Sequence, residues 1–192
     1  FIGFIAFTLT ASANAFKKVA YIPSYRMAHL EDINYDLITH VMAAFANPDE
    51  EGNLSYDGYD MHTFVSLVHS NNAEAIISIG GGGDYSWGAK VAIYESLFSS
   101  QESRTDFIHK IMTYMRTYNF DGLDNDLEGN ALALANFNAF TQELGDSLHA
   151  NGYEYSAAIG VGGTWGVNYW DDESLNKLDF IMTMSYGGVG DW

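Results

Sequence analysis

The sequence predicts an α/β protein built on a (β/α)8 TIM barrel, of which about six of the eight β/α units are visible. Apolar runs of strand length alternate with segments that carry apolar residues at helical spacing. This alternation is typical of a parallel sheet, and its repetition without a visible switch point favours a barrel. A chain of 192 residues is one domain or part of one, and the absence of cysteine excludes a disulfide framework.

The composition narrows the classes of partner. Apolar and charged residues make up 47% and 17% of the chain, which are values of a globular protein. The net charge of −17 argues against nucleic acid and anionic membrane as partners, because their phosphates would be repelled. The six histidines show no spacing of a metal site, so we expect neither a metal nor another cofactor.

The first residues resemble an export signal. Residues 1–11 form an apolar run of the length of a signal-peptide core, and Ala13 and Ala15 give the small-x-small form of a cleavage site. The run is too short to span a membrane, although a buried N-terminal strand or helix is an alternative. We therefore expect residues 1–15 to be a partial signal peptide. The exported protein, secreted or periplasmic, would then consist of the barrel domain over residues 16–192.

Six segments have the character of strands. The run at residues 39–46 is continuously apolar, which suits a strand buried on both faces. The expected strands are residues 19–23, 39–46, 75–79, 121–128, 155–159 and 179–186.

Helical spacing marks the segments between the strands. Residues 103–118 form the clearest helix, with an apolar stripe along one side. Asp60 is a plausible N-cap, and Asn151 and Gly152 are typical of a helix end. Residues 47–53 carry the signals of a loop. The expected helices are residues 30–37, 60–70, 103–118, 131–150 and 171–177.

The stretch from Asp121 to Gly129 is hard to explain as ordinary folding. As a strand it would point Asp124, Asp126 and Glu128 to one face, because side chains alternate along a strand. The three carboxylates would then lie within roughly 7 Å of one another. Such crowding disfavours joint ionisation, so protons are shared and at least one pKa rises. A raised carboxyl pKa is what a general acid needs at neutral pH.

Other interpretations of the acidic and glycine-rich stretches are weaker. Asp124, Asp126 and Glu128, here called the acidic row, start like a calcium-binding loop. Counted from Asp124, however, the acid required at the twelfth position falls on Ala135. A solvated turn is disfavoured because Leu123 and Leu127 alternate with the acids. The run Gly80–Gly83 fits neither a phosphate loop nor a dinucleotide motif. Close approach of two backbones at a strand end explains these glycines better.

The acidic row and its companions resemble a known family. The residues from Asp121 to Glu128 match the DGxDxDxE signature of the family 18 glycoside hydrolases, which comprise chitinases and chitinase-like endo-β-N-acetylglucosaminidases. Residues 19–24, 78–81 and 184–186 resemble, in the same order, the first barrel strand, the SxGG of the third and the MxYD of the sixth. The resemblance covers nearly everything after the leader.

The resemblance implies retaining, substrate-assisted hydrolysis of the β-1,4 bonds of N-acetylglucosamine polymers. Glu128 would protonate the leaving oxygen and later act as the base, while the substrate's own acetamido oxygen attacks the anomeric carbon. Asp126 would hold the acetamido N–H and stabilise the positive charge, and Asp124 would share a proton with Asp126. Tyr186 would donate a hydrogen bond to the acetamido oxygen.

The resemblance also implies a saccharide-binding mouth, because barrel strands present their chemistry at their C-terminal ends. Trp87, Trp165 and Trp170 lie on expected loops, where they either stack on sugar faces or anchor the loops. The residues expected to bind the saccharide are Tyr21, Gly81, Trp87 and Met184.

Departures from the family pattern leave alternatives open. Leu127 stands where chitinases often have an aromatic residue, and Gly187 replaces the acid or amide that usually follows the tyrosine. Six units precede Trp192, so we expect a chain truncated at its C-terminus. An endo-β-N-acetylglucosaminidase acting on N-glycan cores and a non-catalytic carbohydrate-binding relative are the alternatives. Glu128 favours the enzyme, since an acid kept beside two others is costly unless used.

Overall fold

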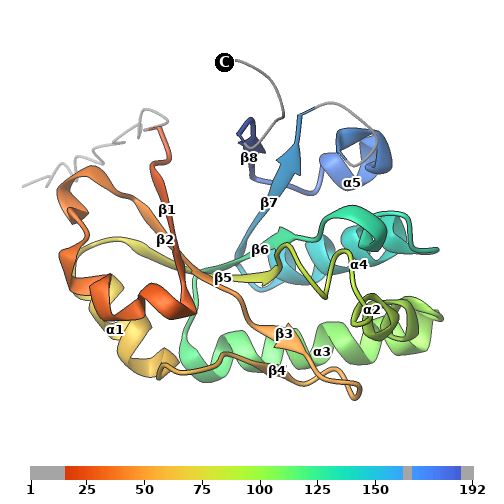
Figure 1. Ribbon diagram of the computed structural model, residues 1–192, viewed down its shortest axis with the longest axis horizontal. Helices are drawn as coiled ribbons and strands as arrows, with labels where there is room; N and C mark the ends of the chain where they lie inside the picture. The colour runs from red at the N-terminus through yellow and green to blue at the C-terminus, as the bar shows by residue number, and fades with distance from the viewer. Residues whose placement is uncertain (1–15, 162–165, 187–192) are drawn as a thin grey trace, which may run out of the picture.

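The computed structural model describes residues 16–161 and 166–186, and the expected signal peptide lies outside these residues. A six-stranded parallel sheet forms the centre, and each of its strands pairs with the next one along the chain (Figure 1). The strands are β1 (Val19–Pro23), β2 (His40–Ala44), β5 (Glu74–Gly80), β6 (Gly122–Asp126), β7 (Glu154–Gly160) and β8 (Phe180–Met184). All six expected strands are present, although the acidic strand ends at Asp126, before Glu128.

Helices connect the strands. They are α1 (Met61–Ser70), α2 (Val91–Phe98), α3 (Gln101–Tyr118), α4 (Phe137–Ala150) and α5 (Asp172–Leu175). Asp60 caps α1 as expected, because its carboxylate accepts hydrogen bonds from the backbone N–H groups of His62 and Thr63. No helix in the described residues has both the length and the apolar character that crossing a bilayer requires.

The structure corrects three helix and loop expectations. The helix expected over residues 131–150 begins at Phe137, because Asn136 has a left-handed backbone (φ 68°) that a continuous helix does not allow. The segment expected as a brief helix near residues 30–37 consists of two 3₁₀ helices, Ser24–Asp32 and Tyr35–Leu37. Part of the expected loop at residues 47–53 pairs as a small hairpin of β3 (Asn47–Pro48) and β4 (Leu54–Ser55).

The two faces of the sheet have different environments. Helices α1, α3 and α4 lie along one side of it (Figure 1). Leu123, Tyr155 and Ala157 belong to the same hydrophobic core as residues of these helices, and Phe98 and Phe107 both stack on Phe140 within it. Met42, Ile76, Ser78, Asp124 and Ser156 alternate with such core residues along their strands, so they occupy the opposite, inner face. This curled sheet with one helical layer is an incomplete (β/α)8 barrel.

A polar layer closes the inner face at the N-terminal ends of the strands. The buried ring of His40 on β2 lies 2.9 Å from Glu154 Oε2 on β7 and packs edge-on against Phe180 on β8. Lys17 donates a hydrogen bond to the other oxygen of Glu154. These partners lower the pKa of Glu154 to about 2, with the His40 hydrogen bond as the largest cause. The layer ties three strands together at the end of the sheet opposite to the end that carries Glu128.

This layer predicts a pH dependence of stability. Because the pKa of Glu154 is lowered to about 2 by folding, the unfolded chain binds more protons between that pH and about 4.5. The contribution of Glu154 is therefore complete above about pH 4.5 and is lost as the pH falls toward 2. We expect Glu154→Gln to flatten the rise of the urea midpoint between pH 2.5 and 5. Glu50→Gln, which removes an exposed carboxyl group, is the control. If the urea midpoint rose equally with pH in both variants, this assignment would be contradicted.

Candidate active site

Asp124 lies between side chains from the two neighbouring strands of the sheet. Ser78 on β5, Asp124 on β6 and Ser156 on β7 are direct register partners, so their side chains share the inner face. Asp124 Oδ2 accepts hydrogen bonds from the Ser78 hydroxyl at 2.7 Å and from the Tyr21 hydroxyl at 2.8 Å, and Oδ1 accepts one from the Ser156 hydroxyl at 2.9 Å. The carboxyl group is fully buried. Burial raises the pKa of Asp124, and the hydrogen bonds oppose that rise.

Asp126 lies one step closer to the C-terminal end of β6. Its side chain is 6% exposed, and its Oδ1 atom has no hydrogen-bond partner among the described residues. Burial, followed by the negative charges of Asp124 and Glu128, raises the pKa of Asp126 to about 9. Asp126 therefore carries a proton at neutral pH and offers an uncommitted oxygen.

Glu128 lies just beyond the paired part of β6. Its backbone stays extended (φ −128°, ψ 169°), so the alternation of side chains that begins with Asp124 continues to Glu128 although the strand pairing does not. Its side chain is half-buried, and burial raises its pKa. A half-exposed carboxyl with a raised pKa is suited to exchange a proton with a bound molecule.

The loop after β5 holds the backbone around Glu128. The Ser86 hydroxyl, fully buried, accepts a hydrogen bond from the Glu128 N–H at 3.1 Å and donates one to the Gly81 carbonyl at 2.6 Å. The Asn130 N–H bonds to the Ser86 carbonyl at 2.9 Å. The two loops that follow β5 and β6 are thus joined on both sides of Glu128.

The glycines at the end of β5 allow two backbones to approach closely. The Gly81 N–H donates to the Asp126 carbonyl at 2.7 Å. Gly80 has φ 97°, and a Cβ atom there would lie 2.5 Å from the Asp126 carbonyl oxygen. This geometry supports the interpretation of the glycine run as a close approach of backbones.

Gly80→Ala should therefore lower the free energy of unfolding more than the same substitution at a glycine without close neighbours. The new methyl group would meet backbone atoms that cannot rotate away, and its φ is unfavourable for alanine. We expect a loss of about 1–3 kcal/mol in the free energy of unfolding, measured by urea denaturation. Gly83→Ala is the matched control, because Gly83 also has a positive φ (89°) but has nothing within 4 Å of its added Cβ. Equal losses in both variants would show that φ strain alone is responsible.

Trp87 lies beside Glu128. A Cβ atom on Gly129 would lie 2.5 Å from the indole of Trp87, so the indole rests directly against the residue that follows Glu128. Trp87 is 46% exposed, which leaves part of its ring accessible. Trp170, in contrast, is 6% exposed and packs edge-on against Phe137, so it anchors its loop and does not offer a sugar platform. Trp165 lies outside the described residues.

The remaining expected site residues lie around the same end of the sheet. Tyr186 is 75% exposed, and its pKa is raised by the partial desolvation of its hydroxyl and then by electrostatic interaction with Asp126 and Glu128. Tyr21 is 38% exposed and reaches Asp124 from β1. Met184 is half-buried on the inner side of β8, opposite Gly160. Gly81 is buried, and its backbone N–H donates a hydrogen bond to the Asp126 carbonyl.

Two serines of this site were not anticipated from the sequence. Ser86 sits in a loop and Ser156 in a strand, and neither belongs to a recognisable spacing. Ser156 becomes visible only when the register of β6 and β7 is known. The role of Ser86 can be recognised only from the contact between the loops that follow β5 and β6.

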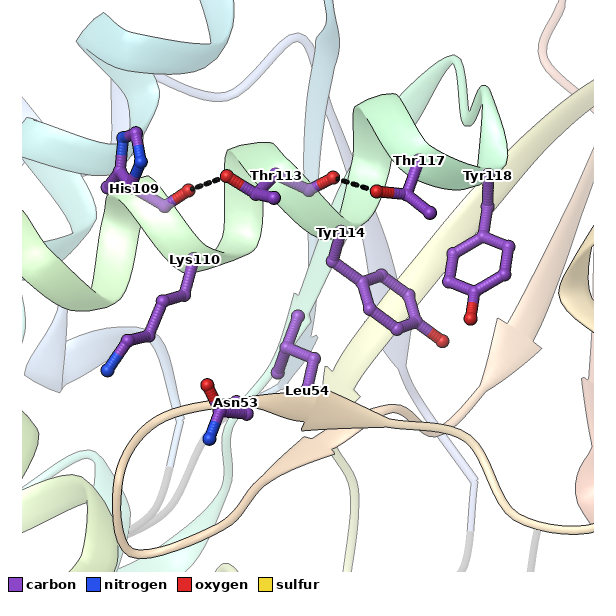
Figure 2. A pocket seen from close by; sticks show the side chains of 8 residues that line it. All are labelled: Asn53, Leu54, His109, Lys110, Thr113, Tyr114, Thr117 and Tyr118. Atoms are coloured by element: carbon purple, nitrogen blue, oxygen red, sulfur yellow. Dashed lines mark hydrogen bonds between the residues drawn. The ribbon is translucent and has the colours of Figure 1, made fainter.

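A separate hollow lies on the outside of the barrel. It has a volume of about 400 Å³, lies between α3 and the β3–β4 hairpin and contains none of the expected site residues (Figure 2). Its one lysine, Lys110, is already paired with Asp106 at 2.9 Å. In residues 16–161 and 166–186, no three His, Asp or Glu side chains are grouped to hold a metal ion. The acidic row therefore remains the candidate active site.

Comparisons with known proteins agree with this architecture. The model of the Glycosyl hydrolases family 18 matches residues 17–192. A probable chitinase 2 of Drosophila melanogaster is 28% identical over 90% of this chain. The crystal structure of a family 18 chitinase, ChiB, from the chitin utilization locus of Flavobacterium johnsoniae superimposes with a TM-score of 0.82 at 31% identity over 91% of this chain.

A chitinase-like agglutinin from Robinia pseudoacacia is also similar, with a TM-score of 0.75 and 26% identity over 88% of this chain. The chain spans 39% of the Drosophila protein and 55% of the Flavobacterium chain. The family model covers almost the whole chain, and the fold agrees with that of the Flavobacterium chitinase. The chain therefore belongs to family 18 of the glycosyl hydrolases.

Proposed function

We propose that the protein hydrolyses β-1,4 bonds in N-acetylglucosamine polymers such as chitin, with retention of configuration and with the substrate's acetamido group as the nucleophile. The observation that supports this most directly is the row of Asp124, Asp126 and Glu128, in which burial increases from the half-exposed Glu128 to the fully buried Asp124. Such a gradient leaves Glu128 accessible to a glycosidic bond and places the more buried Asp126 and Asp124 where their charges act on the acid and on a bound sugar.

Glu128 is the proposed general acid and base. Its raised pKa favours the protonated form that must donate to the glycosidic oxygen as the C–O bond breaks. The acetamido carbonyl oxygen forms a bond to the anomeric carbon in the same step and gives an oxazolinium ion. Water then attacks the anomeric carbon and loses a proton to the Glu128 carboxylate. The acetamido group is restored, and so is the proton of Glu128.

Asp126 is the proposed partner of the acetamido N–H. Its free Oδ1 atom can accept that hydrogen bond, and the developing positive charge on the oxazolinium ion favours the ionised form of a carboxyl group. The proton that Asp126 carries at rest would then pass to Asp124. Tyr186, which interacts electrostatically with Asp126 and Glu128, is the proposed donor to the acetamido oxygen.

The proposed saccharide path runs over the exposed part of Trp87 and past Tyr21 and Met184. Sugar rings have C–H faces that pack well on an indole. Trp87 fits this role because its ring is fixed against Gly129 and still 46% exposed. A sugar bound on it would lie next to Glu128.

A non-catalytic saccharide-binding function is the second candidate. The similarity to a chitinase-like agglutinin shows that this fold also occurs in a protein that is named as an agglutinin and not as a chitinase. The hydrolase is favoured because a half-buried Glu128 with a raised pKa beside a proton-bearing Asp126 is arranged for proton transfer, which binding alone does not need.

Release of a chromophore from an aryl glycoside of N,N′-diacetylchitobiose tests the proposal, with the full-length protein as the enzyme. We expect turnover, and we expect proton NMR of chitin-oligosaccharide hydrolysis to show the β-anomer first, as retention requires. An α-anomer appearing first would exclude the acetamido mechanism. Binding of chitin oligosaccharides without turnover would establish the second candidate, and turnover of N-glycan cores alone would establish an endo-β-N-acetylglucosaminidase.

We further propose that this reaction takes place outside the cytoplasm. The support is the signal-like pattern of residues 1–15 and the size of chitin, a polymer that a cell meets at its exterior. Residues 16–192 would then contribute β/α units of the catalytic barrel. Mass spectrometry of the mature N-terminus, expected at Phe16, tests this arrangement.

A further inference from the structure

Asp124 and Asp126 lie two residues apart on the same strand and interact electrostatically, and the described residues surround them unequally. Asp124 accepts three hydrogen bonds, two on Oδ2 and one on Oδ1. Asp126 has an Oδ1 atom with no partner. Hydrogen bonds donated to a carboxylate favour its ionised form. The proton is therefore better placed on Asp126 than on Asp124.

The Ser156 hydroxyl has a distinct place among the three donors. Tyr21 and Ser78 both bind Oδ2, so Ser156 is the donor that occupies Oδ1. Without it, Oδ1 would have no described donor and would be the natural position for a proton on Asp124. Ser156 reaches this oxygen because β6 and β7 pair Asp124 directly with Ser156, which puts the two side chains on the same face.

We infer that Ser156 is a positioning residue that keeps Asp124 ionised in the free protein and so leaves the shared proton on Asp126. This inference rests on the proposed function for its catalytic meaning. It explains how Asp126, and not Asp124, becomes the residue that has a proton to give up when a cationic intermediate forms.

Among the residues that the structure describes, no cation contacts Asp124 that could stabilise its charge in place of the hydroxyl groups. The titratable groups that interact with it are Tyr21 from β1, Asp126 from β6 itself and Tyr155 from β7. Burial is the largest cause that raises the pKa of both tyrosines, which keeps them neutral. β5 contributes the neutral Ser78. Within the described part of the chain, the donors to Asp124 are thus three hydroxyl groups, and the loss of one should measurably change the pKa of Asp124.

The test is a carbon NMR titration of the full-length protein labelled at the aspartate carboxyl carbons, without substrate. In the wild type we expect Asp124 to be ionised and Asp126 protonated near pH 7. Ser156→Ala should raise the titration midpoint of Asp124 by about one pH unit, because one hydrogen bond to the charged form is lost. Ser156→Thr, which keeps a hydroxyl group on a strand-forming residue, should bring the midpoint back toward the wild-type value.

Ser174→Ala is the matched control. Ser174 is equally buried, but it lies on α5 and bonds to Asn138 and Gln142, so the Asp124 titration should not move. An unchanged Asp124 midpoint in folded Ser156→Ala would overturn the inference. A wild type with Asp124 protonated and Asp126 ionised would overturn it as well, even if the alanine variant does not fold. Because no substrate is present, these outcomes are independent of whether the protein hydrolyses the aryl glycoside.

Discussion

Glu128→Gln should reduce turnover of an aryl chitobioside by at least about 10³-fold while the affinity for chitin oligosaccharides changes little. The amide keeps the size of the carboxyl group but has no proton to give to the glycosidic oxygen and no charge to accept one from water. General acid and base catalysis each contribute about 10²–10⁴-fold, and Glu128 is proposed to serve in both steps. Chromophore release and calorimetric titration with a chitin oligosaccharide measure the two quantities.

The structure supplies a control for this substitution. Glu50→Gln removes an exposed carboxyl group between β3 and β4, which is not among the proposed site residues, and should leave both turnover and binding unchanged. If binding fell together with turnover in Glu128→Gln, Glu128 would be a binding residue and its role as the acid would be wrong. If turnover persisted, another group would have to supply the proton.

Asp126→Asn should reduce turnover by about 10²–10³-fold, the usual cost of removing one group that stabilises the charge of a transition state. Asparagine can accept the acetamido N–H, but it cannot become the carboxylate that offsets an oxazolinium ion. The exposed Asp57→Asn is the matched control and should leave turnover unchanged. Initial rates with the aryl chitobioside measure both variants, and a loss of less than about threefold in Asp126→Asn would remove Asp126 from the mechanism.

The same variant has an effect on stability that does not depend on substrate. The pKa of Asp126 is raised by folding to about 9, so the folded protein binds more protons than the unfolded chain between about pH 4 and 9. Asp126 therefore makes the stability fall as the pH rises through that window. Asparagine does not titrate, so the difference in urea midpoint between Asp126→Asn and the wild type should grow in favour of the variant from pH 5 to pH 8. A constant difference would mean that Asp126 is ionised at neutral pH.

The strands and the acidic row were predictable because both leave local patterns. Each strand is an apolar run bounded by loop residues, and Asp124, Asp126 and Glu128 repeat with the period of a strand. The N-cap at Asp60 was predictable for the same reason, since a capping residue acts within one helical turn. The helix α2 was missed because its eight residues follow a glycine-rich loop and show no clear apolar stripe.

The sequence by itself determined the barrel architecture, the family resemblance and the identity of the acids, because alternation, spacing and motif are properties of neighbours along the chain. Only the tertiary structure decided how burial divides the acids, so that Asp124 is enclosed, Asp126 holds the proton and Glu128 stays reachable. It also decided that Ser156 and Ser86 touch them and that Trp170 is a packing residue. The physical reason is that desolvation and hydrogen bonding depend on groups brought together from distant strands and loops, and no local pattern records those contacts.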